Sequence, residues 1–205
     1  MKKLISLLLS LVMAFSFALS VSAKTYGDYE FKVLSDKTIK IISYYRENAK
    51  KVTIPSKIEG KKVTVIGDYA FLTTEKIKTL KLGKYIKKIG MSAFEDCISL
   101  KKVTIPNSVK IIDDDAFSSC EKLKGVKIGK KVKIINDYAF HCCESLKSVT
   151  IPKNVKKIGF WAFGYYYNDD IDAISKVKGF TIKGYKGTAA SKYAMKNGFK
   201  FKEIK

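Results

Sequence analysis

A 23-residue period constrains the fold of this chain more than any other feature. The stretch "IGMSAFEDCISLKKVTIPNSV" begins at Ile89, "IDDDAFSSCEKLKGVKIGKKV" at Ile112 and "INDYAFHCCESLKSVTIPKNV" at Ile135. The pair Ala-Phe recurs every 23 residues, at Ala70-Phe71, Ala93-Phe94, Ala116-Phe117, Ala139-Phe140 and Ala162-Phe163. An active site is normally assembled once, whereas a structural unit can be built many times. Such regular self-similarity predicts a solenoid, in which each coil stacks on the next.

The spacing within one unit predicts short strands joined by a tight turn. Apolar residues alternate at Val103 and Ile105, so we expect these side chains to point inward and the residue between them to point outward. Pro106 follows, and later units have glycine or proline at the same place, where proline lacks a ladder N–H and glycine tolerates unusual dihedral angles. Val109 and Ile112 then bring the chain back across the core.

The Ala-Phe block predicts a short helical turn. Ala116, Phe117 and Cys120 are spaced so that one turn of helix directs them to the same side. No single coil can bury this much apolar surface, so each must stack on its neighbours. We therefore expect a mainly β solenoid of right-handed parallel coils, with short helical turns.

The two ends of the chain predict capping units, which cover the core and the strand edges that end coils would expose. Alternating apolar residues flank "SDKT" within residues 26–45, which predicts a β-hairpin. Near the C-terminus, Thr188 can cap a helix that runs to about Lys196, and Gly198 can end it before the strand "FKFKEI". The expected closing unit is strand, helix, strand.

The first residues predict a secretory signal peptide. Lys2 and Lys3 precede an apolar run that ends in Val21-Ser22-Ala23, a small-residue pattern that favours cleavage before Lys24. The alternative is an uncleaved anchor, although the run is short. We expect a secreted or surface-associated protein with no transmembrane segment after cleavage. The predicted organisation is signal peptide 1–23, capping hairpin 24–51, solenoid 52–182 and closing unit 183–205.

The charge of the chain points to anionic partners. The sequence has 40 basic and 19 acidic residues, so removal of two lysines with the signal peptide leaves 38 against 19, a net charge of +19. Arg46 is the only arginine. Secretion makes nucleic acid an unsuitable partner, and the excess charge instead fits wall polymers, acidic glycans or acidic host proteins.

Two columns of lysine follow the repeat. The first comprises Lys50, Lys78, Lys101, Lys124, Lys147 and Lys178, and the second Lys87, Lys110, Lys133 and Lys156. Stacked coils would place neighbours in a column about 4.8 Å apart, forming basic ridges. One interpretation is polyanion capture, because an anionic polymer relieves the repulsion between aligned charges. The other is solubility, because repeated lysines keep strand edges from pairing.

Two interruptions lengthen the period, and the second gathers aromatic residues. The interval from Ile54 to Leu82 is 28 residues, with the excess around "KIEGKK", and that from Ile151 to Ile182 is 31, with the excess near "GYYYNDDIDA". A candidate sugar or peptide platform comprises Phe160, Trp161, Tyr165, Tyr166 and Tyr167, beside Asp169, Asp170 and Asp172. Alternatively, this longer segment simply covers the last coil.

No motif predicts catalysis, a metal or a cofactor. Cys97, Cys120 and Cys143 occupy one repeat position, which favours a ladder of inward thiols, with a disulfide between neighbours possible but not implied. "HCC" at 141–143 contains the sole histidine and has no accompanying pair of ligands. The repeated aspartates that include Asp68, Asp114 and Asp137 sit in like environments, which favours a solvated turn over acid-base chemistry.

The pattern "AFxxCxxLxxVxIPxxVxxIGxxAF" resembles the BspA-like leucine-rich repeats, a family of secreted and surface proteins of bacteria. The resemblance covers residues 52–182, and both terminal segments are similar to the capping units of such proteins. It implies the α/β leucine-rich-repeat class and a non-catalytic scaffold for protein or glycan binding and adhesion, with a surface protein or an acidic glycan as partner. The alternative is a structural component of the cell envelope, held electrostatically to anionic wall polymers.

Overall fold

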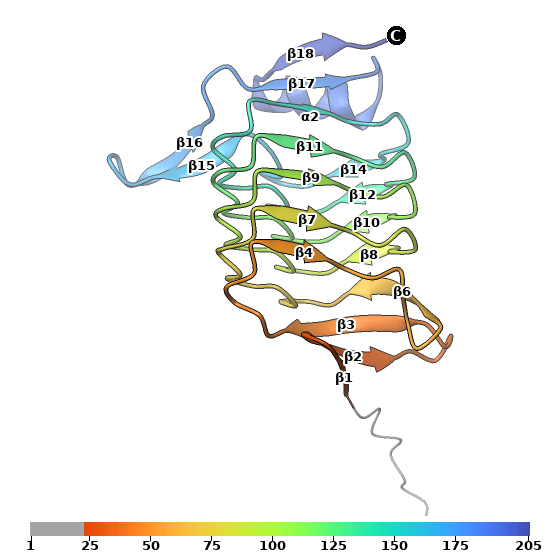
Figure 1. Ribbon diagram of the computed structural model, residues 1–205. Helices are drawn as coiled ribbons and strands as arrows, with labels where there is room; N and C mark the ends of the chain where they lie inside the picture. Colours follow the sequence, from red (N-terminus) through yellow and green to blue (C-terminus); the bar gives the residue numbers. More distant parts are fainter. Residues whose placement is uncertain (1–22) are drawn as a thin grey trace, which may run out of the picture.

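The protein is a β-solenoid built on two sheets, as shown by a computed structural model that describes residues 23–205 (Figure 1). The predicted signal peptide lies outside the described residues, apart from Ala23, its last residue. Strands of the two sheets alternate along the chain, and the coils rise in a right-handed sense from the N-terminal to the C-terminal cap. The expected mainly β architecture is thus confirmed.

The nine-stranded sheet contains the N-terminal cap and one short strand from each coil. Its strands are β1 (Lys24–Tyr26), β2 (Tyr29–Val33), β3 (Ile39–Tyr44), β6 (Lys61–Ile66), β8 (Lys88–Ile89), β10 (Ile111–Ile112), β12 (Ile134–Ile135) and β14 (Lys157–Ile158), with β5 (Lys57–Ile58) paired to β6. From β3 onward the neighbours along this path are parallel. Ile112 pairs with Ile89 and Ile135, so the register advances by one 23-residue repeat per strand.

The seven-stranded sheet contains the V-x-I segments. Its strands are β4 (Lys51–Thr53), β7 (Thr79–Lys81), β9 (Lys102–Thr104), β11 (Gly125–Lys127), β13 (Ser148–Thr150), β17 (Thr181–Gly184) and β18 (Lys200–Glu203). All of its pairings are parallel. Val103 and Val149 turn inward and are buried, and the residues on either side of Val103 are exposed, as the alternation predicts.

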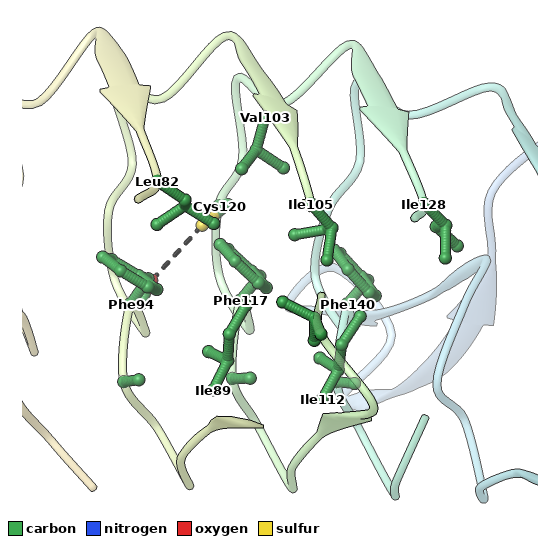
Figure 2. Packing of buried hydrophobic residues seen from close by; sticks show 14 of the residues in the cluster. Leu82, Ile89, Phe94, Val103, Ile105, Ile112, Phe117, Cys120, Ile128 and Phe140 are labelled. Carbon is green, nitrogen blue, oxygen red and sulfur yellow. Dashed lines mark hydrogen bonds between the residues drawn. The ribbon is translucent and has the colours of Figure 1, made fainter. Parts of the chain in front are cut away.

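Stacked rings and thiols fill the space between the sheets (Figure 2). The rings of Phe71, Phe94, Phe117, Phe140 and Phe163 form one stack, with neighbouring centroids 4.9–5.1 Å apart. Each cysteine of the predicted ladder is buried, and Cys120 Sγ donates to the carbonyl of Phe94 at 3.4 Å, as Cys143 does to Phe117 at 3.2 Å. All four cysteines of the chain are free thiols. The predicted inward columns of phenylalanine and cysteine are therefore confirmed.

The Ala-Phe blocks form tight turns in place of a regular helical turn. Asp115 and Ser119 flank Phe117 with φ of 52° and 53°, and the residues at the same positions around Phe71, Phe94 and Phe140 also have positive φ. The reason lies in the hydrogen bonds, because Phe117 N–H donates to Ala139 O at 2.9 Å, in the next coil. An N–H directed along the solenoid axis cannot donate back along its own helix.

Both caps continue the sheets of the solenoid. The strands β2 and β3 form the expected hairpin around "SDKT", and β3 then pairs in parallel with β6. At the other end, α2 (Ala189–Asn197) lies between β17 and β18, and Gly198 ends it in the left-handed conformation with φ 65°. Thr188 precedes α2 but its hydroxyl makes no capping bond and donates instead to Tyr185 O, because a turn brings that carbonyl within 2.6 Å.

Tyr193 of α2 replaces the missing next coil. Its hydroxyl accepts from Phe163 N–H and donates to Phe163 O, both at 2.9 Å, and its ring meets the Phe163 ring edge-on at 6.3 Å. In earlier coils the N–H of the stacked phenylalanine donates to the alanine carbonyl one repeat later. The Tyr193 hydroxyl therefore satisfies the last backbone groups of this ladder.

The two interruptions are β-hairpins. The first is β5–β6, with Glu59 and Gly60 at its turn in the left-handed region. The second is β15 (Tyr165–Asn168) with β16 (Ala173–Lys176), which projects from the side of the solenoid (Figure 1). This segment therefore extends away from the last coil instead of only covering it.

Candidate polyanion-binding surface

The solenoid segregates its charges by position in the repeat. From residue 66 to 163 every acidic residue lies within four positions of a stacked phenylalanine, and no lysine does. We call these segments, centred on Phe71, Phe94, Phe117, Phe140 and Phe163, the turn edge. Because the coils stack in register, the acids share one edge of the solenoid, and the lysines line the strands and the opposite turns.

The first lysine column is continuous over five coils. Its members Lys50, Lys78, Lys101, Lys124 and Lys147 are all exposed. The backbone fixes its spacing, because Lys78 N–H donates to Lys50 O at 2.9 Å and Lys124 N–H donates to Lys101 O at 2.9 Å. A groove of about 560 Å³ opens along the first three coils and is lined by Lys50, Lys51, Lys78, Thr79, Lys101 and Lys102.

Lys178 lies outside this column. The register pairs Ser148 with Thr181, so the position beside Lys147 falls at Phe180, whose side chain is buried. The residues before β17 belong to the longer last period. Their distance in sequence from the strand therefore differs from that in earlier coils. The sixth lysine predicted for the column is therefore displaced from the ridge.

The second column lies on a different side of the coil, just before the strands of the nine-stranded sheet. Lys110 N–H donates to Lys87 O at 2.8 Å, Lys133 N–H to Lys110 O at 2.8 Å, and Lys156 N–H to Lys133 O at 2.7 Å. All four side chains are exposed. Lys87 and Lys110 also line a groove of about 450 Å³ with Tyr85, Lys131 and the carboxylate of Asp36.

A third set of lysines, on the outer face of the seven-stranded sheet, was not predicted as a site. Lys127 lies between Thr104 and Thr150 in register, and Lys81 lies beside Thr53. Threonine thus separates Lys81 and Lys127 from other lysines in register, which avoids like charges directly opposite each other, whereas Lys183 and Lys202 pair directly in the C-terminal cap. The alternation in the sequence could have predicted this set, because each of these residues follows an inward Val or Leu and therefore points outward. The first column has no such spacers, so its repulsion is left in place.

Neither lysine column forms an ion pair within the described residues. Within residues 23–205 ion pairs join Lys24, Lys40, Lys61, Lys88 and Arg46 to acids, and no lysine of either column takes part. Most carboxylates of the solenoid are at the turn edge, although Asp36 lines the groove beside Lys87 and Glu144 stands three residues before Lys147. Lys147 Nζ donates to the backbone carbonyl of Glu144 at 3.0 Å, and among the described residues no carboxylate lies within ion-pair distance of a column lysine.

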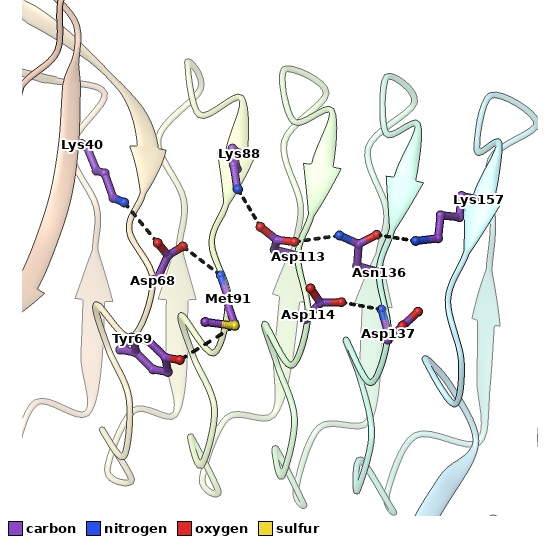
Figure 3. Close-up of polar contacts among 10 residues, drawn as sticks. All are labelled: Lys40, Asp68, Tyr69, Lys88, Met91, Asp113, Asp114, Asn136, Asp137 and Lys157. Carbon is purple, nitrogen blue, oxygen red and sulfur yellow. Dashed lines mark hydrogen bonds and ion pairs between the residues drawn. The ribbon is translucent and has the colours of Figure 1, made fainter.

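Carboxylates of the turn edge, in contrast, bond to neighbouring coils (Figure 3). Asp68 accepts from Met91 N–H at 3.1 Å, Asp114 from Asp137 N–H at 3.0 Å, and Asp137 from Phe160 N–H at 2.9 Å. Each bond links one coil to the next over 23 residues. The interpretation of these aspartates as solvated turns missed this role, since only the stacked structure brings the donors into reach.

Asp113 belongs to a chain of polar side chains across four coils (Figure 3). Lys88 Nζ lies 2.6 Å from its carboxylate, Asn136 Nδ2 donates to it at 2.7 Å, and Lys157 Nζ donates to Asn136 Oδ1 at 3.2 Å. Burial raises the pKa of Asp113, but the hydrogen bonds from Lys88 and Asn136 outweigh it and hold the pKa below its ordinary value. The hydrogen bond to Asp113 in turn raises the pKa of Lys88.

The predicted aromatic platform is divided by the structure. Phe160 and Trp161 stack with centroids 4.4 Å apart, and Phe160 is 52% exposed. Tyr165 is buried and donates to Asn197 Oδ1 at 2.9 Å, Tyr166 packs against the core, and Tyr167 is exposed on the β15–β16 hairpin.

Two further, partly buried rings pack beside Phe160 and Trp161. Tyr138 meets Phe160 and Trp161 edge-on at 5.8 and 6.0 Å, and His141 stacks beside Trp161 at 6.1 Å. Sequence reasoning missed these contacts, although both residues stand one period before the aromatic segment. We name Tyr138, His141, Phe160 and Trp161 the aromatic cluster.

The thiols and the histidine are not arranged as an activated pair. His141 Nδ1 lies 3.3 Å from Cys142 Sγ, but burial lowers the pKa of His141 and raises the pKa of Cys142 to about 11. A reactive thiolate needs the opposite shift at sulfur. Burial likewise raises the pKa of Cys97 to about 12. Among residues 23–205, no three His, Cys, Asp or Glu side chains converge as metal ligands.

The comparisons with known proteins agree on leucine-rich repeat proteins. A model of the BspA-type leucine-rich repeat region matches residues 37–168 in six copies. A leucine-rich repeat protein of T. pallidum is similar in structure, with 24% identity and a TM-score of 0.67 over 79% of this chain and 71% of that one. A leucine-rich repeat protein of Bacteroides ovatus has 27% identity and a TM-score of 0.65, over 78% of this chain and 46% of that one.

The pneumococcal vaccine antigen PcpA shares the fold at 21% identity and a TM-score of 0.65, with 90% of this chain and 48% of that chain covered. This chain thus spans less than half the length of the Bacteroides ovatus and pneumococcal proteins. No curated protein matches it. In the part of the chain that the structure describes, none of the helices has the length and apolarity needed to cross a bilayer.

Proposed function

Because the chain belongs to the BspA-type leucine-rich repeat family, we propose that it is a secreted, non-catalytic binding scaffold whose first lysine column captures anionic polymers at the cell surface. The family supports a binding scaffold in general. The ligand class is inferred from this chain's own charge. Secretion follows from the predicted signal peptide and not from the fold.

The observation that carries the proposal is the unbroken column from Lys50 to Lys147, exposed and outside every ion pair of the described residues. Neighbouring charges about 4.8 Å apart repel each other by about 1 kcal/mol in water, before screening by salt. An anionic chain laid along the ridge removes this repulsion. Lysine suits such a ligand because its ammonium acts as a mobile point charge, without the fixed geometry of arginine.

A wall polymer or an acidic glycan fits the ridge better than a compact anion. The column extends over five coils, so its length along the axis is about four coil spacings, or roughly 19 Å. Repeating anionic groups can contact it without a unique register. Because no unique register is required, the same contacts would also allow adhesion to acidic surface glycans of another cell.

Retention on an immobilised uronic acid polymer tests the proposal. We expect residues 24–205 to bind polygalacturonate beads at low salt and to elute as salt is raised. The triple variant Lys101→Glu, Lys124→Glu and Lys147→Glu should lose retention while keeping its thermal unfolding temperature within a few degrees. The control Lys186→Glu, Lys192→Glu and Lys205→Glu has the same net charge, and it should keep most of the retention. Equal loss of retention in both variants would mean that net charge alone accounts for binding. Unchanged retention in the first variant would disprove the role of the column.

A further inference from the structure

A separate amphipathic groove lies at the carboxyl ends of β11 and β13, under the C-terminal cap. It has a volume of about 600 Å³, within the usual range for ligand sites. Val126, Pro152, Tyr185 and Ile204 give it an apolar lining. Lys127, Lys130 and Lys153 also line it, and all three are exposed. We name it the cap groove. The carboxyl ends of β11 and β17 lie on the same side of the solenoid, as Figure 1 shows.

The ladder that pairs β11 with β13 is shorter than the ladders on either side of it. The register joins β9 to β11 at three residues and β13 to β17 at three, but joins β11 to β13 only at Lys127 and Thr150. Val126, in this short ladder, is half-buried, whereas Val103 and Val149 are 3% and 2% exposed. An inward valine of the core thus borders the groove at this place.

Gly125 directly precedes Val126 in β11, although it does not itself line the groove. Its register partner in the preceding coil is Lys102, which carries a long side chain. A Cβ at Gly125 would meet only Lys102 Cγ, at 3.7 Å, so packing does not require glycine here. Gly129 differs, because a Cβ there would lie 2.3 Å from Pro106 O. The absence of a side chain at Gly125 leaves the strand surface bare next to Val126.

The charges at the groove are basic and unpaired. Within the described residues, Lys127, Lys130 and Lys153 form no ion pair, and no carboxylate lines the groove. The turn that carries Lys130 is fixed by its backbone, because its N–H donates to Asn107 Oδ1 at 2.8 Å and its carbonyl accepts from Asn154 Nδ2 at 2.9 Å. The ammonium groups thus extend from an ordered turn around an apolar surface.

We propose that the cap groove binds a short acidic peptide segment with one apolar side chain between carboxylates. The apolar side chain would lie against Val126, Tyr185 and Ile204, with the carboxylates beside the three lysines. An extended peptide keeps its backbone in water over this open groove, whereas an acyl chain would leave one side exposed. A uronic acid polymer, for its part, has no side chain to fill the apolar part. The proposal stands independently of polymer capture by the first lysine column.

Two peptides of equal charge test this site by calorimetric titration of residues 24–205. They are Ac-Asp-Glu-Phe-Asp-Glu-NH2 and the same peptide with serine in place of phenylalanine. We expect the phenylalanine peptide to bind at least about fivefold more tightly, because only it buries apolar surface. Equal affinities would overturn the proposal, since the lysines alone would then explain binding. Tighter binding of dodecanoate that displaces the peptide would overturn it in favour of a lipid ligand.

Variants then locate the site. The charge reversal Lys127→Glu, Lys130→Glu and Lys153→Glu should weaken binding of the phenylalanine peptide at least about tenfold. The matched reversal Lys78→Glu, Lys101→Glu and Lys124→Glu should leave the affinity ratio of the two peptides unchanged. Tyr185→Ser and Ile204→Ser, each checked for a cooperative thermal transition, should bring the ratio toward one. A ratio that persists in the folded serine variants would place the peptide elsewhere and overturn the assignment.

Discussion

The turn edge and the first lysine column are both built by repetition, but they use their charges in opposite ways. At the turn edge, the carboxylates of Asp68, Asp114 and Asp137 accept hydrogen bonds from backbone N–H groups of the next coil. The Asp113 carboxylate lies 2.6 Å from Lys88 Nζ. In the column, lysines face solvent without an ion pair among the described residues, and Lys147 Nζ donates to a backbone carbonyl, that of Glu144. Repetition therefore does not distinguish a structural column from a binding one. What distinguishes them is whether the polar groups are already satisfied within the protein.

The largest effect should come from the buried side of the turn edge. Phe117→Ala removes one ring from the stack between Phe94 and Phe140, and a core truncation of this kind costs about 3–5 kcal/mol. Denaturant unfolding measures the loss, with Lys101→Ala as an exposed control that should change stability little. A Phe117→Ala protein as stable as the unmodified one would contradict the assignment of this column to the core.

The end of the same stack should be the next most sensitive position. Tyr193→Phe keeps the ring but removes the hydroxyl that bonds both the N–H and the carbonyl of Phe163. Because these groups are buried, we expect a loss of about 2–3 kcal/mol in denaturant unfolding. The control is Tyr185→Phe, whose hydroxyl makes no such pair of bonds. Equal stability of the two variants would mean that water replaces the hydroxyl at the last coil.

A single carboxylate of the turn edge should have a smaller effect. Asp137→Ala leaves Phe160 N–H without its acceptor, and the loss of such a bond costs about 1 kcal/mol. Asp137→Asn keeps an acceptor oxygen and should recover part of the loss. Asp170→Ala, in the exposed turn of the β15–β16 hairpin, should be neutral in the same thermal unfolding assay. An Asp137→Ala protein with unchanged stability would return this aspartate to the role of a solvated turn.

The smallest stability effect should depend on pH. The pKa of Asp113 is lowered in the folded protein, so its contribution is present above the ordinary pKa of 3.8 and is lost as pH falls below it through the folded value. The partly exposed pair limits this contribution to less than about 1 kcal/mol. Stability measured from pH 6 to pH 2 should therefore fall less steeply in Asp113→Asn. Parallel stability profiles of the unmodified protein and Asp113→Asn would contradict a lowered pKa of Asp113 in the folded protein.

The inward columns and the lysine columns follow from local spacing, which is why the sequence predicts them. Alternation fixes which strand residues point inward, and a constant period aligns equivalent residues of successive coils. Lys178 shows the limit of this reasoning, because the longer last period places Phe180 beside Lys147. A residue can match the repeat by spacing and still lie out of register.

Contacts between coils could not be predicted in the same way. The Asp137 carboxylate reaches Phe160 N–H, and the Tyr193 hydroxyl reaches Phe163, only after stacking fixes the distance between segments 23 and 30 residues apart. The aromatic cluster has the same origin, since Tyr138 and Trp161 meet across neighbouring coils. The positive φ of Asp115 and Ser119 has no local signal such as glycine, because hydrogen bonds to the next coil impose the turn.

The salt dependence of polymer binding tests the central claim most directly. If the first lysine column displaces counterions from an anionic chain, the logarithm of the binding constant for polygalacturonate should fall linearly with the logarithm of salt concentration. Replacing Lys101, Lys124 and Lys147 by glutamine should make this slope shallower by about two to three, whereas the same replacement of Lys186, Lys192 and Lys205 should leave it nearly unchanged. Equal slopes for the two triple variants would contradict the account, because the column would then contribute no more than any other three lysines.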